Sequence, residues 1–332
     1  MRVGFSASYE QRKAIRLQQA RLSRPEPLLE IVRSSLPPDF APASVTGSVQ
    51  SMHPDRFVTR VDVRSAGGEE RVFAVKAYAD DFGKRVWTVA RMLVENGGPS
   101  ELHLPSAYVP QERALVFPWV EGEALSDIVD ERKPQLLRQA ADLAARLHRV
   151  PIVPDAPTTA QMMVDDALGR CDRLRIQLPE TVPAIGELMA PLQEAFTCLD
   201  PADLAPVHGD LSGSQFLWTG DRLVLLDLDM CGYTDPAYDA GHFLAQQERR
   251  CLLDSTLPAH SAQWLDCFRD TYLAAMPHVS ARNVAFYHGL TLIRKIYTLC
   301  TRRPEEWTRI IPPLAARARA ALEVATTREQ TA

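Results

Sequence analysis

The spacing of apolar residues changes character once along this chain, near Glu121. Before that point, apolar and polar residues alternate over 44–52, 56–64 and 71–78, a period of two that is typical of strands with one buried face. After it, apolar residues recur every three or four positions, as they do in amphipathic helices. We therefore predict an α+β fold, with a small antiparallel sheet followed by a large, mainly helical part.

Turn residues support this division. The predicted strands are separated by turns at 52–55 and 65–68, which contain Pro, Asp and Gly. Gly97 and Gly98 follow a helical pattern over 84–95, where a helix C-cap is expected. The remaining predicted elements are a helix over 11–24 ended by Pro25 and Pro27, strands at 107–110 and 114–120, a hairpin within 205–228, and helices over 133–149, 161–177, 184–199, 239–245, 261–275, 282–300 and 312–327.

Length sets the number of domains that we expect. At about 150 residues per domain, 332 residues correspond to about two domains. We predict an N-terminal helical extension over 1–40, a sheet lobe over 41–121 and a helical lobe over 122–332.

Composition excludes several classes of protein. None of the 16 glycines lies in a GxGxxG or GxxxxGK[ST] motif, so two common phosphate-binding loops are absent. Net charge is −5 with both signs interspersed, which argues against nucleic-acid binding. The six cysteines form no CxxC pair, and Glu10, Arg12 and Lys13 stand where a secretory signal would be apolar. We expect a cytoplasmic monomer or homodimer that binds neither nucleic acid nor membrane.

The densest group of polar residues lies within 207–229. Asp210 and Asp227 each follow an apolar segment and are 17 residues apart across the predicted hairpin. Neighbouring carboxylates repel each other unless a cation or proton lies between them. Carboxylate oxygens with an amide oxygen from Gln215 suit Mg²⁺, which usually takes one or two carboxylates and completes its shell with water or phosphate.

Three other interpretations of this segment are weaker. A serine-hydrolase elbow needs Gly-x-Ser-x-Gly, but Leu211 stands at the centre of Gly209–Gly213. Asp227 and Asp229 form the DxD pair of a haloacid-dehalogenase nucleophile strand, yet Met230 replaces the usual glycine and no later strand supplies further acids. A hairpin that merely carries surface acids is the third alternative.

His208-x-Asp210-x-x-x-x-Gln215, followed by Asp227, resembles the catalytic loop and metal-binding aspartate of the aminoglycoside phosphotransferase and choline kinase group. The resemblance covers about residues 40–245 and implies a two-lobed, protein-kinase-like fold. It also implies transfer of phosphate from ATP or GTP, with Mg²⁺, to a hydroxyl of a small molecule. Further matching segments occur in the same order, namely Phe73–Lys76, Phe117–Gly122, Leu143–His148 and Gly232–Asp239.

The resemblance assigns roles to residues of the helical lobe. It implies that Asp210 takes or orients the proton of the acceptor hydroxyl and that Asp227 binds Mg²⁺. Gln215 would bind a second metal ion. The other assignments are His208 as a structural support or a catalytic group, Asp239 as an anchor for the backbone amides of the catalytic loop, and Asp229 as a metal ligand or an acid behind one.

The resemblance also assigns nucleotide-binding residues to the sheet lobe. Lys76 would pair with the nucleotide phosphates, and Ser51 in the first hairpin would contact them. Adenine would lie between the lobes. The remaining assignments are Phe117, Trp119 and Val120 as walls or backbone partners of the base, and Glu95 as the acid that pairs with Lys76.

Two departures from the family pattern leave an alternative open. Gln215 stands where the family has asparagine, and Glu95 lies at the end of its helix rather than near the start. A catalytically weak, nucleotide-binding or regulatory protein on the same fold is therefore the second hypothesis. The acceptor stays open among antibiotics, sugars and amino alcohols, although the C-terminal helices lack the acidic cluster that a cationic aminoglycoside needs.

Overall fold

The computed structural model describes residues 7–257 and 259–327 and has the predicted α+β fold. Contacts divide the chain into two compact units. The sheet unit contains the described residues up to Glu95 together with Leu102–Gly122, and the helical unit contains Asn96–Glu101 and the chain from Glu123 onward. The described part of the predicted extension, residues 7–40, therefore belongs to the same unit as the sheet.

The sheet unit is built on five antiparallel strands in the order β1-β2-β3-β5-β4. In β2, every second residue is buried, as the alternating pattern predicts. A β-bulge interrupts β1 between Val49 and Ser51. The strands span Pro42–Met52 (β1), Arg56–Ser65 (β2), Glu70–Tyr78 (β3), Ala107–Val109 (β4) and Ala114–Pro118 (β5).

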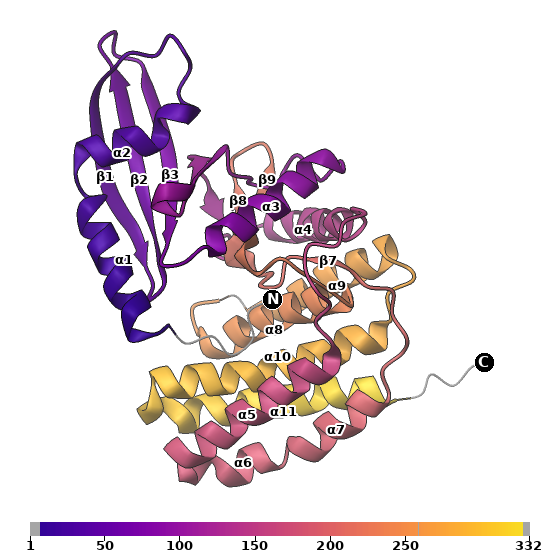
Figure 1. The fold of residues 1–332 in the computed structure, drawn as a ribbon. Coiled ribbons are helices and arrows are strands. Elements are labelled where there is room, and N and C mark those ends of the chain that lie inside the picture. The colour runs from indigo at the N-terminus through magenta and orange to yellow at the C-terminus, as the bar shows by residue number, and fades with distance from the viewer. Residues whose placement is uncertain (1–6, 258, 328–332) are drawn as a thin grey trace. The chain divides into compact units, whose positions relative to one another are not determined.

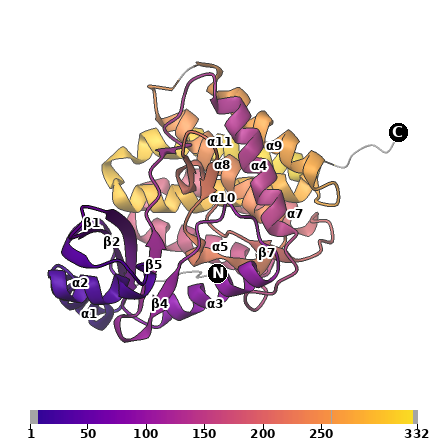
Figure 2. The same cartoon turned by 90° about the horizontal axis from the view of Figure 1, so that it is seen from above.

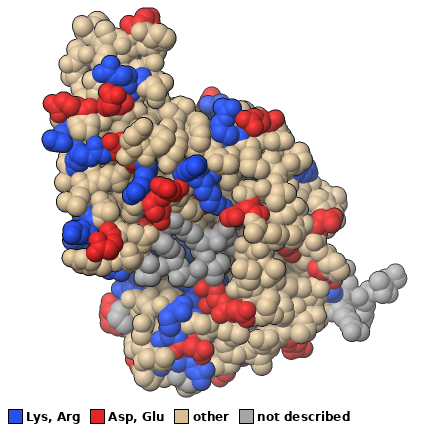
Figure 3. Space-filling model, in the orientation of Figure 1, with Lys and Arg blue, Asp and Glu red and all other residues tan. Residues whose placement is uncertain are grey.

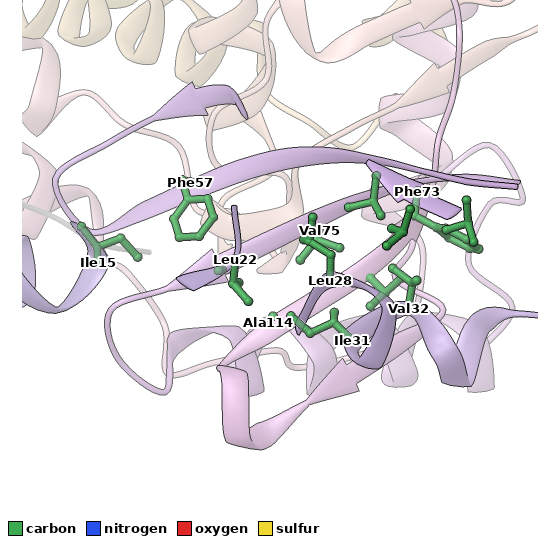
Figure 4. Packing of buried hydrophobic residues seen from close by; sticks show 14 of the residues in the cluster. Ile15, Leu22, Leu28, Ile31, Val32, Phe57, Phe73, Val75 and Ala114 are labelled. Carbon is green, nitrogen blue, oxygen red and sulfur yellow. The ribbon is translucent and has the colours of Figure 1, made fainter. Parts of the chain in front are cut away.

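Two helices, α1 (Tyr9–Arg21) and α2 (Pro25–Val32), lie on one face of this sheet (Figure 1, Figure 2). The predicted helix over 11–24 corresponds to α1, which ends at Arg21, before Pro25. The second helix was not predicted; Pro25 is its first residue, a position where proline is tolerated. Figure 4 shows the packing beneath these helices. Its labelled residues include Ile15, Leu22, Leu28, Ile31 and Val32 from the helical segments and Phe57, Phe73, Val75 and Ala114 from the strands. The opposite face packs on α3 (Phe82–Glu95) through Tyr78, Val86 and Leu115.

The helical unit is centred on α10 (Ala281–Arg302), which packs against α8, α11 and α5 (Figure 1). The predicted helix over 184–199 is two helices, since a continuous one would place Pro191 in its interior, whereas α7 has it in its first turn. The other helices are α4 (Lys133–His148), α5 (Ala160–Gln177), α6 (Val182–Gly186), α7 (Met189–Thr197), α8 (Ala237–Leu253), α9 (Gln263–Ala275) and α11 (Trp307–Thr326).

Five short strands complete the helical unit. Strands β6 (Glu123–Ala124), β8 (Phe216–Trp218) and β9 (Leu223–Leu225) form one antiparallel sheet, and β7 (Ala205–Val207) pairs with β10 (Gly232–Thr234). Both sheets flank the loop that carries Asp210. In the described residues, no helix combines the length and the hydropathy needed to cross a lipid bilayer. The face shown in Figure 3 carries Lys and Arg interspersed with Asp and Glu, in keeping with the modest net charge.

Helices α8 and α10 approach each other closely at Gly241. A Cβ at this position would lie 2.6 Å from the backbone nitrogen of His288 and 2.7 Å from the carbonyl oxygen of Val284. Neither backbone atom can move without shifting α10. Gly169, inside α5, offers a contrast, because a Cβ there would come no closer than 3.7 Å to the side chain of Arg173.

We expect Gly241→Ala to lower the free energy of unfolding by about 1–3 kcal/mol, since the overlap with α10 outweighs the gain in helix propensity. The matched variant Gly169→Ala should raise it by up to about 1 kcal/mol. Denaturant melts of both variants measure the difference. Equal effects of the two substitutions would contradict the close packing of α8 on α10.

Candidate active site

The loop after β7 is held in place by one buried carboxylate at the start of α8. Asp239 accepts hydrogen bonds from the backbone N–H of His208 (2.6 Å, Oδ2) and of Gly209 (2.9 Å, Oδ1). The Nε2 atom of His148 donates a third, at 3.0 Å to Oδ2. Burial opposes ionisation of Asp239, but the hydrogen bond and the charge of His148 outweigh it, so the pKa of this carboxyl lies below its usual range. Asp239 is therefore an ionised anchor for the loop.

The side chain of His208 ties the same loop to the segment that follows β9. Its Nδ1 accepts from the backbone N–H of Asp210 at 3.3 Å, so its Nε2 carries the proton and donates to the carbonyl oxygen of Leu226 at 2.8 Å. The backbone N–H of Leu226 donates in turn to the carbonyl oxygen of Gln215 at 2.8 Å. His208 is completely buried and acts as a structural link in these contacts. These bonds fix Gln215 and Leu226 next to each other.

Asp227 follows Leu226 and has a left-handed backbone conformation, with φ 60°. Few residues other than glycine adopt this conformation, and strain of this kind clusters at functional sites. Its carboxylate accepts from the backbone N–H of Asp229 at 3.3 Å, and Asp229 is itself buried.

The oxygen donors of Asp227 and Gln215 suit Mg²⁺. The described residues contain no group of three His, Cys, Asp or Glu side chains that could hold a metal. Mg²⁺ does not require such a cage, because it commonly uses one or two protein oxygens and completes its shell with water and phosphate. The residues present thus fit an ion that is held jointly with a phosphorylated ligand, and the assignments of Asp227, Gln215 and Asp229 stay predictions.

Asp210 lies in the wall of a pocket of about 430 Å³, which Gln215 also lines. Its side chain is 45% exposed, and its Oδ1 accepts a hydrogen bond from His242 Nε2 at 3.1 Å. Burial raises the pKa of Asp210, but the hydrogen bond from His242 and the positive charge of Lys295 lower it by more, so the net shift is downward. The carboxylate is ionised and open to a ligand.

His242 is a site residue that the sequence reasoning missed. It is buried, and burial lowers its pKa, so the neutral ring donates from Nε2 to Asp210 and accepts at Nδ1 from the hydroxyl of Tyr238 at 3.4 Å. Arg294 donates to the oxygen of Tyr238 at 3.2 Å. In the series Arg294, Tyr238, His242 and Asp210, each residue donates a hydrogen bond to the next, and the series ends at the carboxylate. His242 lies three residues after Asp239 on α8, so helical spacing was the signal that could have found it.

In the sheet unit, the strand register places Lys76 and Ser51 on one face. Val58 is the cross-strand partner of both residues, so all three share a row that runs perpendicular to the strands. At about 4.8 Å between strands, the backbones of Lys76 and Ser51 are roughly 10 Å apart. Lys76 is buried, with its ammonium 5.8 Å from the centre of the Tyr78 ring. A ligand phosphate between Lys76 and Ser51 would fit this spacing.

Glu95 lies at the exposed end of α3, where its carboxylate forms an ion pair with Arg91 at 3.0 Å. The ion pair with Arg91 is a sufficient explanation of Glu95 as a surface acid. Its proposed pairing with Lys76 stays a prediction.

The end of β5 and the two residues after it contain the residues that were expected beside the base. Phe117 packs with the apolar cluster under α3, and the ring of His103 lies 5.1 Å from it, centre to centre. Burial lowers the pKa of His103, and its Nε2 contacts the carbonyl oxygen of Pro118 at 2.7 Å. His103 was not predicted from the sequence.

The side chain of Trp119 contacts two charged residues of the sheet unit. The Arg60 guanidinium lies 4.9 Å above its ring, and its indole N–H donates to Glu121 at 2.7 Å. Val120, next along the chain, is half-buried. The structure thus gives Trp119 a packing role, while a role of Trp119 or Val120 toward a nucleotide stays a prediction.

Comparison with known proteins identifies the family. Residues 89–278, more than half of the chain, match the phosphotransferase enzyme family (APH). A search of curated proteins finds no significant match.

Solved structures share the fold at low sequence identity. A protein from Ralstonia eutropha, provisionally described as an aminoglycoside phosphotransferase, has a TM-score of 0.65 at 13% identity, covering 90% of this chain and 99% of that one. Choline kinase from Cryptosporidium parvum has a TM-score of 0.60 at 13% identity, covering 90% and 94%. The ADP-bound aminoglycoside phosphotransferase APH(2'')-Ib has a TM-score of 0.58 at 14% identity, covering 90% and 99%.

These matches confirm the resemblance that the ordered motifs predict. The low identities to the solved structures establish a common protein-kinase-like fold and leave the substrate open. The family match covers Asp210, Gln215, Asp227 and Asp239, so the loop that Asp239 anchors lies inside the matched region. The chain belongs to the phosphotransferase enzyme family.

Proposed function

We propose that this phosphotransferase transfers the γ-phosphoryl group of ATP or GTP to a hydroxyl group of a small molecule, with Mg²⁺. The observation that carries the proposal is the ionised carboxylate of Asp210. It stands in a pocket wall, on a loop that Asp239 anchors, and is hydrogen-bonded by His242. A general base needs this combination of ionisation, access and fixed orientation.

Asp210 would act on the acceptor. Its carboxylate accepts the proton of the acceptor hydroxyl while the hydroxyl oxygen forms a bond to the γ-phosphorus. The bond between that phosphorus and the oxygen bridging to the β-phosphate breaks, and the nucleoside diphosphate leaves. Because phosphoryl transfer depends on positioning and charge more than on covalent catalysis, the orientation that His242 imposes on Asp210 contributes directly.

Nucleotide binding is proposed for the buried cation Lys76 and the hydroxyl of Ser51, which share a face of the sheet. Support comes from a relative with the same fold, APH(2'')-Ib, whose structure contains ADP. Mg²⁺ on Asp227 and Gln215 would neutralise phosphate charge. Since Gln215 has one methylene more than asparagine, its amide oxygen reaches further. The longer side chain also loses more conformational entropy when it binds a metal ion.

We expect Asp210→Asn to lower kcat by about 10²–10⁴-fold, because the amide cannot accept the proton of the hydroxyl, while nucleotide affinity is kept. Asp270→Asn, at an exposed acid of α9, serves as the control and should leave kcat unchanged. Turnover is followed as nucleoside diphosphate release and as phosphorylated acceptor. A protein that binds Mg²⁺-nucleotide but forms no product with any acceptor would instead be the catalytically weak alternative.

A pH profile tests the role of His242. His242→Leu removes the donor that lowers the pKa of Asp210 and leaves the effect of burial, which raises it. Activity is lost as the pH falls through this pKa, so the acid limb of log kcat/KM should move to higher pH. His242→Gln keeps a donor near the Nε2 position and should return the acid limb to the pH of the unsubstituted protein. An acid limb that is the same in all three proteins would show that His242 does not set the ionisation of Asp210.

A further inference from the structure

The pocket beside Asp210 is rich in positive charge. Its walls come from the catalytic loop, α8 and α10, and its volume is about 430 Å³. Four cations face two carboxylates there, whereas the face of the protein shown in Figure 3 has mixed charges. The charged residues that line the pocket are Asp127, Asp210, Arg249, Arg250, Lys295 and Arg302.

Ion pairs within the protein neutralise only one of these four cations. Arg250 lies 3.6 Å from Asp127 and 3.7 Å from Asp254, so it is neutralised within the protein. Arg249, Lys295 and Arg302 form no ion pair with any residue that the structure describes. The Nε atom of Arg249 is buried without a hydrogen-bond partner there, and a buried unpaired donor is costly.

The three unpaired cations repel one another. Burial lowers the pKa of Lys295 to about 8, and Arg249, Arg294 and Arg302 lower it as well, although Asp210 raises it. Burial also lowers the pKa of Arg249, with added repulsion from Arg250, Arg302 and Arg303. An anion in the pocket would relieve this repulsion and supply acceptors for the guanidinium donors.

The lining is poorly suited to a cation. None of the residues that the structure places around the pocket is aromatic, so it lacks the ring faces that bind quaternary ammonium groups. Its two carboxylates are already engaged, Asp127 by Arg250 and Asp210 by His242. The uncharged lining is mostly hydroxyl and amide groups, which suit a hydroxylated ligand. These groups belong to Ser126, Ser212, Ser214, Gln215, Gln246, Gln247 and Thr298.

We propose that the acceptor of this phosphotransferase is an anion, a small hydroxylated compound that carries a phosphate or carboxylate group. Arg249, Lys295 and Arg302 bind the anionic group, and the hydroxyl to be phosphorylated lies at Asp210. The proposal rests on the proposed function for the phosphoryl transfer, but the anion site can be tested without turnover.

The experiment compares acceptors that share a carbon skeleton and differ in charge. Glucosamine, glucose, gluconate and glucose 6-phosphate form one such set, and amino alcohols, glycols, hydroxy acids and their phosphate esters form a second. Each is offered to the full-length chain with Mg²⁺ and ATP or GTP. We expect phosphorylated product only from the anionic members of each set. Comparing the rates with the carboxylate and with the phosphate ester shows which anion is preferred.

Matched arginine variants locate the site. Arg249→Gln and Arg302→Gln should each raise the KM of the acceptor at least tenfold and leave the KM of the nucleotide unchanged. Arg309→Gln is the control, because Arg309 lies outside the pocket lining and pairs with Glu306. Calorimetric titration with inorganic phosphate, without nucleotide, should show binding that the first two variants weaken and the control does not.

The outcomes separate the two proposals. Product from cationic or neutral acceptors, with KM values insensitive to Arg249→Gln and Arg302→Gln, overturns the anionic acceptor and leaves the phosphotransferase function intact. A rise in nucleotide KM instead assigns these cations to the nucleotide and also overturns it. Phosphate binding that depends on both arginines, without product from any acceptor, supports the anion site and contradicts the transferase function. Neither binding nor product contradicts both.

Discussion

The buried carboxylate of Asp239 makes the interactions on which the loop that carries Asp210 depends. It is fully buried and ionised, and three donors, two of them backbone amides of the loop, compensate for its loss of hydration. Removing one partner of such a buried charge typically costs about 3–5 kcal/mol, so loop and helix are coupled strongly. Because Asp239 lies in the first turn of α8, this helix fixes the position of the loop that precedes it in sequence by some thirty residues.

The rest of the site follows from this anchor. Gly209, which donates to Asp239, has φ 83°, and a Cβ there would collide with the carbonyl group of Met230, so only glycine fits. One residue further, Asp210 meets His242 from the next turn of α8. A single helix thus both anchors the loop and orients its carboxylate. The same helix carries Arg249 into the pocket, which links Asp210, the proposed general base, to the proposed recognition of the acceptor.

Much of this arrangement could be predicted from the sequence. The predictable parts are those that a local residue pattern or a family motif indicates. Alternation of apolar residues found β1, β2 and β3 to within two residues, and the resemblance identified Asp239, whose two bonds to loop amides are present in the structure. The helix that begins at Pro25 was not predicted, because a proline that follows one helix and a proline that begins the next look alike in sequence.

Residues that act through tertiary contact were not predictable in this way. His242, His103 and Arg249 carry no motif, and their importance depends on which groups the fold brings beside them. The basic character of the pocket is a further example. Its cations come from α8 and α10, about fifty residues apart in sequence, and they are diluted in a chain whose net charge is negative. Only the packing of those two helices concentrates them beside Asp210.

Amide hydrogen exchange in Asp239→Asn, measured together with turnover, tests the central role of this carboxylate most directly. The side-chain amide removes the charge and replaces one acceptor with a donor, so fewer loop amides can be satisfied. We predict faster exchange at His208 and Gly209 and a large loss of kcat. Exchange in α10 should be unchanged, because the hydrogen bonds of the Asp239 side chain go to His208, Gly209 and His148. Unaltered protection of the His208 and Gly209 amides, with kcat preserved, would contradict this role.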